Sequence, residues 1–110
     1  MYYTKNDINN LKVTGDYYMP DALLKDPKYK KVRLETKLAY AALLNTAIKN
    51  AKEDESGNIY VVGNDPLNVE YLHLIANKKV DQDKIDGYVD ELDHAGLVDK
   101  LGNSIYLLKD

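Results

Sequence analysis

Two groups of side chains with opposite charge could carry the chemistry of this chain of 110 residues. The first group is a run of cations around Tyr29 that could neutralise nucleic-acid phosphates: Lys28, Lys30, Lys31 and Arg33. The second group consists of carboxylates, which repel phosphate but could meet the cations of a protein: Asp81, Asp83, Asp86, Asp90 and Glu91. In this second region, three side chains are suited to base edges or adjacent phosphates: Gln82, Lys84 and Lys100.

The net charge also divides along the chain. Residues 1–50 hold nine Lys and Arg against five Asp and Glu, a net charge of +4. Residues 51–110 hold six Lys against thirteen Asp and Glu, a net charge of −7. Because affinity for DNA comes largely from cations that neutralise phosphates, the first half favours nucleic acid and the second half disfavours it.

The sequence carries no signature of catalysis or of a cofactor. It has no Cys, no phosphate loop and no nucleophile elbow. His73 and His94 stand far apart, and no carboxylate completes a metal-binding spacing with them. No apolar run could span a bilayer, and residues 1–11 lack the pattern of a signal peptide. We therefore expect a cytoplasmic protein that is not an enzyme, with no cofactor, no metal, no membrane contact and no small-molecule substrate.

Hydrophobic spacing and turn signals predict the elements that position these side chains. Residues 1–15 predict a flexible N-terminal arm, and residues 16–110 predict a single domain. Apolar residues at spacings of three and four predict a helix over 34–51 that is buried on several sides. Residues 59–62 predict a strand, and Asp65 followed by Pro66 predicts the start of a second helix, which ends near Asn77.

The acidic group falls on a third predicted helix. Asp81 is suited to cap its first turn, and Gly96 is suited to close it. Ile85, Val89 and Leu92 share the face that points to the core, so the carboxylates point to solvent. Residues 97–98 and 104–108 predict a hairpin. The order of elements predicts an α+β, mostly helical winged-helix fold, in which a helix-turn-helix precedes a short β-hairpin wing.

Six stretches, in this order and spacing, resemble RepA-type plasmid replication initiators of Gram-positive bacteria. They are residues 18–24, 28–30, 35–44, 54–60, 91–97 and 105–107, and the resemblance covers roughly residues 17–108. The resemblance implies an N-terminal winged-helix domain that binds origin repeats, often as a dimer. In such initiators a further domain follows this one. The chain departs from the family pattern in its acidic third helix and in its short connection over residues 99–104.

Two functions remain as hypotheses. In the first, a DNA-binding domain of a replication initiator recognises origin repeats, and backbone contacts come from Lys28, Lys30, Lys31 and Arg33 while Gln82, Lys84 and Lys100 meet bases or adjacent phosphates. In the alternative, a free-standing acidic protein inhibits a nucleic-acid-binding protein as an anti-CRISPR-like DNA mimic, and its contacts are Asp81, Asp83, Asp86, Asp90 and Glu91. The acidic face could also be simply solvated, with its early Asp residues complementing the helix dipole. A homodimer is compatible with either function.

Overall fold

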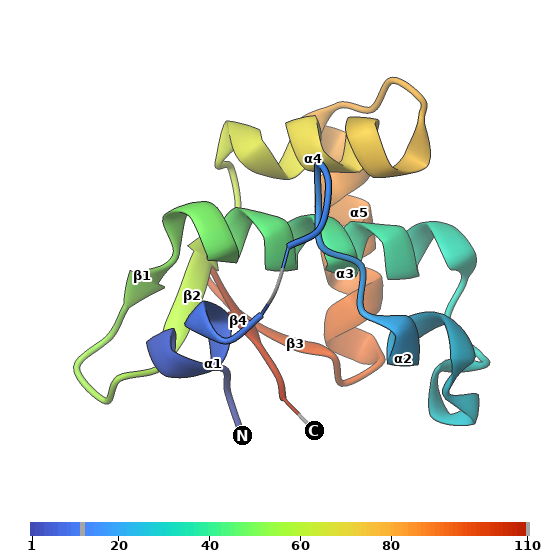
Figure 1. Ribbon diagram of the computed structural model, residues 1–110. Helices are drawn as coiled ribbons and strands as arrows, with labels where there is room; N and C mark the ends of the chain where they lie inside the picture. The colour runs from blue at the N-terminus through green and yellow to red at the C-terminus, as the bar shows by residue number, and fades with distance from the viewer. Residues whose placement is uncertain (12, 110) are drawn as a thin grey trace.

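A central helix and a small antiparallel sheet organise the computed structural model, which describes residues 1–11 and 13–109 (Figure 1). The elements in chain order are α1 (Lys5–Asn9), α2 (Asp21–Lys25), the 3₁₀ turn η1 (Pro27–Tyr29), α3 (Leu34–Asn50), β1 (Lys52–Glu53), β2 (Ile59–Val62), α4 (Pro66–Ala76), α5 (Gln82–His94), β3 (Val98–Leu101) and β4 (Ser104–Leu107). The strand order is β1-β2-β4-β3, and every neighbouring pair is antiparallel. None of the helices in the described residues combines the length and apolar content that crossing a membrane requires.

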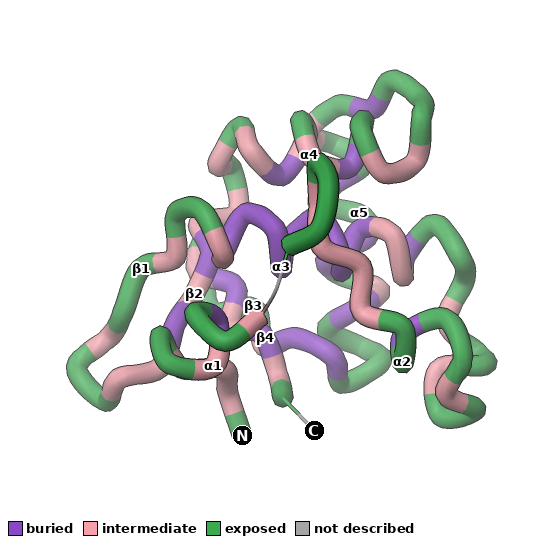
Figure 2. Tube along the Cα trace, in the orientation of Figure 1, coloured by how far each residue is buried: buried purple, intermediate pink, exposed green. Residues whose placement is uncertain are grey.

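Helix α3 is the centre of the core. Every residue from Ala39 to Ala47 is buried, so its middle turns contact protein all round (Figure 2). Helices α4 and α5 and strand β2 all pack against it. Four small alanines in this stretch allow the neighbouring elements to approach closely, while Leu43 and Leu44 fill the space between them. Full burial of each of these leucines contributes about 1.5–3 kcal/mol to folding.

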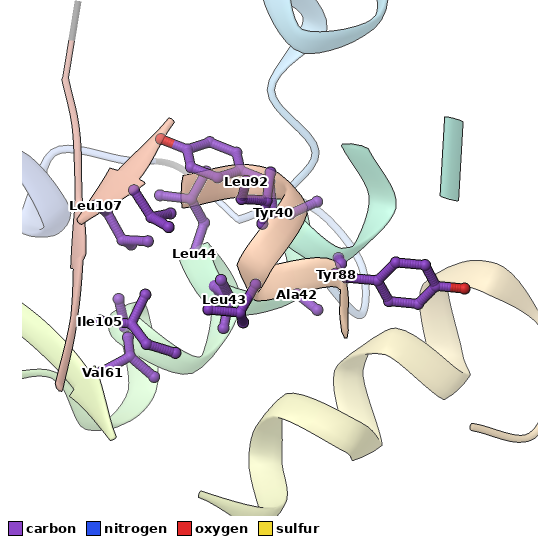
Figure 3. Packing of buried hydrophobic residues seen from close by; sticks show 14 of the residues in the cluster. Tyr40, Ala42, Leu43, Leu44, Val61, Tyr88, Leu92, Ile105 and Leu107 are labelled. Atoms are coloured by element: carbon purple, nitrogen blue, oxygen red, sulfur yellow. The ribbon is translucent and has the colours of Figure 1, made fainter. Parts of the chain in front are cut away.

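The inner face of the sheet follows from alternation along two strands. Ile59 and Val61 of β2 are buried, as are Ile105 and Leu107 of β4, whereas the residues between them face outward. Figure 3 shows Val61, Ile105 and Leu107 beside the leucines of α3 and α5. The core therefore extends from the sheet across α3 to α4 and α5.

Local signals fix the ends of α4 and α5, as the sequence predicts. The Asp65 carboxylate accepts a hydrogen bond from the Leu67 N–H, and the Asp81 carboxylate accepts one from the Lys84 N–H. Asn77 ends α4 in the left-handed conformation, with φ 54°. With α4 and α5 as the helix-turn-helix and β3–β4 as the wing, the predicted α+β winged-helix fold is confirmed.

Residues 1–11 contact the sheet region and the core. Tyr2 pairs with Leu108 and Thr4 with Asn58 as isolated antiparallel bridges, so the segment adds to the sheet region. Thr4 and Asp7 form a reciprocal capping box at the start of α1, and Ile8 is buried in the core. A helix this short has no detectable periodicity in the sequence, because one turn does not repeat. Lys12 in the expected arm and Asp110 at the end of the expected domain lie outside the described residues.

Candidate nucleic-acid interface

Helix α5 presents to solvent a row of exposed residues that includes two carboxylates. Ile85, Tyr88, Val89 and Leu92 are buried on its inner side. On the opposite side, residues three or four positions apart form one exposed row, here called the α5 stripe: Asp83, Gly87, Asp90 and His94. Of the acidic group, Asp83, Asp86 and Asp90 are exposed on α5, Asp81 is exposed at its N-cap, and Glu91 is half-buried.

The basic loop of residues 25–33 lies directly beside α5. Arg33 donates from Nε to Glu91 Oε1 at 2.8 Å and from Nη2 to Glu91 Oε2 at 2.6 Å. The Thr36 hydroxyl also donates to Glu91 Oε2, at 3.2 Å. The Arg33 guanidinium lies 5.8 Å from the centroid of the Tyr88 ring. A fork of this kind holds the planar guanidinium in one orientation, so Arg33 is fixed against α5.

This contact joins two residues that the sequence analysis assigns to different functions. Arg33 belongs to the predicted phosphate contacts and Glu91 to the alternative acidic face. Between the loop and α5 lies an open groove of about 520 Å³, whose lining includes Lys31, Arg33, Asp90, Glu91 and His94. The basic loop and the third helix therefore share one face of the molecule.

A second ionic contact lies next to the first. The Tyr88 hydroxyl donates to Glu35 Oε2 at 2.7 Å, and the Lys78 ammonium lies 3.6 Å from the same oxygen. Figure 3 shows the Tyr88 ring extending away from the core, which takes its hydroxyl towards this contact. The hydrogen bond from Tyr88 and the charge of Lys78 lower the pKa of Glu35, and the hydrogen bonds from Arg33 lower the pKa of Glu91. Both carboxylates are therefore ionised at neutral pH.

The wing flanks α5 on its other side. The Lys100 ammonium of β3 lies 3.1 Å from Asp90 Oδ1, so a second predicted DNA contact is paired with a second acidic residue. The turn between β3 and β4 has Gly102 at φ 63°, a conformation that favours glycine. Leu101, beside this turn, is 61% exposed. The wing thus carries one paired cation and one exposed leucine.

The remaining predicted DNA contacts divide into free and engaged side chains. Within the part of the chain that the structure describes, Lys30, Lys31 and Lys84 form no ion pair. The Lys28 ammonium lies 5.0 Å from the centroid of the Tyr29 ring. Gln82 donates from Nε2 to the Gly63 carbonyl at 2.9 Å and to Asp86 Oδ1 at 2.8 Å, so its amide nitrogen is engaged within the protein.

Each histidine has a backbone carbonyl oxygen within hydrogen-bond distance. His73 Nδ1 lies 2.8 Å from the Lys78 carbonyl oxygen, and His94 Nδ1 lies 2.9 Å from that of Asp90. Across residues 1–11 and 13–109, no His, Asp and Glu side chains form a cluster that could hold a metal ion. The two histidines are hydrogen-bonded surface groups of α4 and α5.

Sequence reasoning missed the contacts that tie this face together. Arg33 and Glu91 are separated by 58 positions, and no local pattern links them. The fully buried Asn68, which donates to the Val62 and Gly63 carbonyl oxygens, gave no signal in the sequence either. An Asn near the start of a predicted helix is more often a surface residue.

Similarity to known proteins agrees with the architecture. The family model of the replication initiator protein A (RepA) N-terminus matches residues 16–107. No curated protein matches the chain. Of the solved structures, one described as a Rep–DNA complex is 33% identical, with 99% of this chain and 83% of that chain covered and a TM-score of 0.55.

Two further solved structures have the same TM-score. One is described as the N-terminal domain of a DNA-binding protein and is 30% identical, covering 99% of this chain and 83% of that chain with a TM-score of 0.55. The other is described as an MDR initiator and is 27% identical, covering 99% of this chain and 86% of that chain with a TM-score of 0.55. Together with the family model over residues 16–107, which confirms the resemblance seen in the sequence, they show that the chain belongs to the family of replication initiator protein A N-termini.

Proposed function

We propose that this chain is the DNA-binding domain of a plasmid replication initiator and recognises double-stranded repeats at an origin. The observation that carries the proposal is the family match, which spans the helix-turn-helix and the wing. A similar structure, 33% identical, is described as a Rep–DNA complex. The proposed role is binding rather than catalysis, requires no cofactor and is exercised in the cytoplasm.

The arrangement of charge around α5 is compatible with a recognition helix. A helix in the major groove directs its centre to the base edges, while the phosphates lie along the two rims of the groove, which is about 12 Å wide. Cations are therefore needed beside the helix rather than on its exposed centre. The free ammonium groups of Lys30 and Lys31 are on the side of the basic loop, and Lys100 is on the side of the wing.

The two carboxylates of the α5 stripe, Asp83 and Asp90, would then face bases. A carboxylate there can accept a hydrogen bond from the amino group of cytosine. Lys28 and Arg33 complete the proposed backbone contacts, and Lys84 is the free cation of α5 proposed to meet a base or an adjacent phosphate. Gln82 is not among these proposed contacts, because its amide nitrogen is engaged by Gly63 and Asp86.

The inhibitor alternative has less support from the same contacts. Of its five carboxylates, Asp90 and Glu91 already pair with Lys100 and Arg33, which leaves Asp81, Asp83 and Asp86 for the cations of a partner.

A homodimer on adjacent repeats is part of the proposal. Sedimentation velocity with and without DNA would detect it as a complex that contains two chains.

Fluorescence anisotropy on random-sequence duplex DNA, across a salt series that begins at low salt, tests the proposal. We expect binding that weakens steeply with salt, since each neutralised phosphate contributes about −0.9 to the slope of log K against log[salt]. Replacing both Lys30 and Lys31 with Ala should make the slope shallower by about 1.8.

The control variant replaces Lys49 and Lys52 with Ala. Lys49 lies in the last turn of α3, a helix of 17 residues that starts at the basic loop and spans about 25 Å. This double variant removes the same charge as the Lys30 and Lys31 variant, but from the opposite end of α3. We expect its slope of log K against log[salt] to stay close to that of the unmodified protein. No binding at the lowest salt would overturn the proposed function, and equal slopes for both double variants would remove the basic loop from the interface.

A further inference from the structure

We infer that Gln82 is a positioning residue that fixes the wing against α5 through a hydrogen-bonded junction at Gly63, and that it does not read a base. The Gly63 junction is formed by Gly63, Asn64, Asn68, Gln82 and Asn103. The effect of Gln82 on DNA binding rests on the proposed function, whereas the junction itself is a property of the free protein.

The peptide groups of Gly63 join three elements. Its carbonyl oxygen accepts hydrogen bonds from Gln82 Nε2 of α5 at 2.9 Å and from Asn68 Nδ2 of α4 at 3.2 Å. Its N–H donates to the Asn103 carbonyl oxygen in the wing turn at 2.8 Å. One residue after β2 therefore connects both helices of the helix-turn-helix with the wing.

The wing approaches Gly63 so closely that a side chain there would displace the side chain of Asn103. A Cβ on Gly63 would lie 2.8 Å from Asn103 Oδ1, and the Asn103 Nδ2 donates to Asn64 Oδ1 at 3.1 Å. Gly63 does not have a positive φ, so it is the nearby Asn103 side chain rather than the backbone conformation that a larger residue at this position would disturb.

Asn68 anchors the junction from the side of α4. Its side chain is fully buried, and Nδ2 donates to the carbonyl oxygens of Val62, at 3.1 Å, and Gly63. Its Oδ1 has no hydrogen-bond partner among the described residues. The unpaired buried oxygen is unfavourable, and the two donated hydrogen bonds offset its cost by holding the end of β2 on α4.

The engaged amide of Gln82 argues against direct base reading. A glutamine reads adenine with a bidentate contact in which the amide nitrogen donates to N7 and the amide oxygen accepts from N6. Nε2 carries two hydrogens, and these already serve the Gly63 carbonyl and Asp86 Oδ1. Reading a base would break a bond of the junction.

The test starts with the free protein and the variant Gln82→Met, which keeps a similar side-chain length but has no donor. We expect amide hydrogen exchange at Gly63 to become roughly threefold to tenfold faster, because its bond to the wing lies next to the lost contact. Exchange at Val61, two residues earlier in β2, should remain unchanged. Gln82→Lys restores a donor of similar reach and should recover most of the protection at Gly63.

The second readout is DNA binding to a duplex selected from a random-sequence pool and to each of its single-base-pair variants. For Gln82→Met we expect a lower ratio of selected to random binding, with the loss shared among several base pairs. The control is Lys84→Met on the same helix, which should weaken binding without changing exchange at Gly63.

Unchanged exchange at Gly63 in Gln82→Met, or a loss of preference confined to one base pair, would overturn the inference. If the unmodified protein binds no DNA, the proposed function fails. The exchange measurement would then still decide whether Gln82 holds the wing.

Discussion

Replacing Glu91 with Gln should strengthen DNA binding. In the protein as it stands, Arg33 donates two hydrogen bonds to Glu91, and a DNA phosphate must compete with that carboxylate for the guanidinium. Glutamine leaves a neutral acceptor of the same shape, so the competition and the repulsion between carboxylate and phosphate both decrease.

The exposure of the pair limits the size of this effect. The Arg33 and Glu91 side chains are 60% and 41% exposed, so water screens their attraction. Exposed pairs of this kind change an equilibrium by no more than about fivefold, and removal of a nearby negative charge adds a similar or smaller factor. We expect binding about threefold to tenfold tighter at 0.1 M salt, with a slope steeper by up to about 0.9, because the phosphate contact of Arg33 then forms without competition from Glu91.

Anisotropy titrations across a salt series measure both quantities. Asp93→Asn is the matched control, because it makes the same change of charge on the same helix at a side chain with no ion pair among the described residues. Equal gains for both variants would mean that net charge alone acts and that the Arg33 contact is irrelevant. Weaker binding by Glu91→Gln would refute the reasoning more directly, because Glu91 would then hold Arg33 in its binding orientation.

Three further predictions concern stability. Gly87→Ala should raise the free energy of unfolding in urea by about 0.5–1 kcal/mol, because a Cβ in this position of α5 would meet nothing within 4 Å and alanine favours a helix; unchanged stability would contradict this. Hydrogen bonds from Lys109 and Thr4 hold the pKa of Asp7 at about 2, below its ordinary 3.8, so its contribution to folding is complete above pH 4 and is lost as pH falls towards 2. In Asp7→Asn, the stability measured by circular dichroism should therefore no longer show the part of the acid dependence that Asp7 causes. An acid unfolding profile identical to that of the unmodified protein would exclude this contribution of Asp7. Asn45→Ala should destabilise the domain by roughly 1–3 kcal/mol in the same urea assay, because Asn45 is buried and bonds both the N–H and the carbonyl of Tyr18; a wild-type midpoint would show that water replaces these bonds.

The parts of the fold that the sequence predicts are those with local causes. Asp65 and Asp81 cap the helices that follow them, and Asn77 ends α4, because these side chains act within a few residues of their own position. The β2 strand shows its alternation within residues 59–62. Local interactions of this kind can be read from a single sequence, and they are sufficient to predict the order of helices and strands of a winged helix.

The candidate site depends on contacts that have no local cause. Charge alone assigns Arg33 and Glu91 to different functions, whereas folding places them 2.6 Å apart. Gln82 has the residue type of a base reader, yet its amide is used by Gly63, which is 19 positions away. Helix α1 was missed because five residues are too few for a periodic pattern. The charge and the type of each residue can be read from a sequence, but which residue a side chain contacts depends on the fold.

The adjacent ends of the described chain determine how the domain responds to force. The Lys109 N–H donates to the Met1 carbonyl oxygen at 2.7 Å, and Tyr2 pairs antiparallel with Leu108, so both ends leave from the same edge (Figure 1). Tension applied between these ends would load the hydrogen bonds one after another, as in a zipper, instead of shearing several at once. The terminal segment and β4 would peel away first, while α3, α4 and α5 stayed packed, so the domain is mechanically weak along the one direction in which its own ends can be pulled.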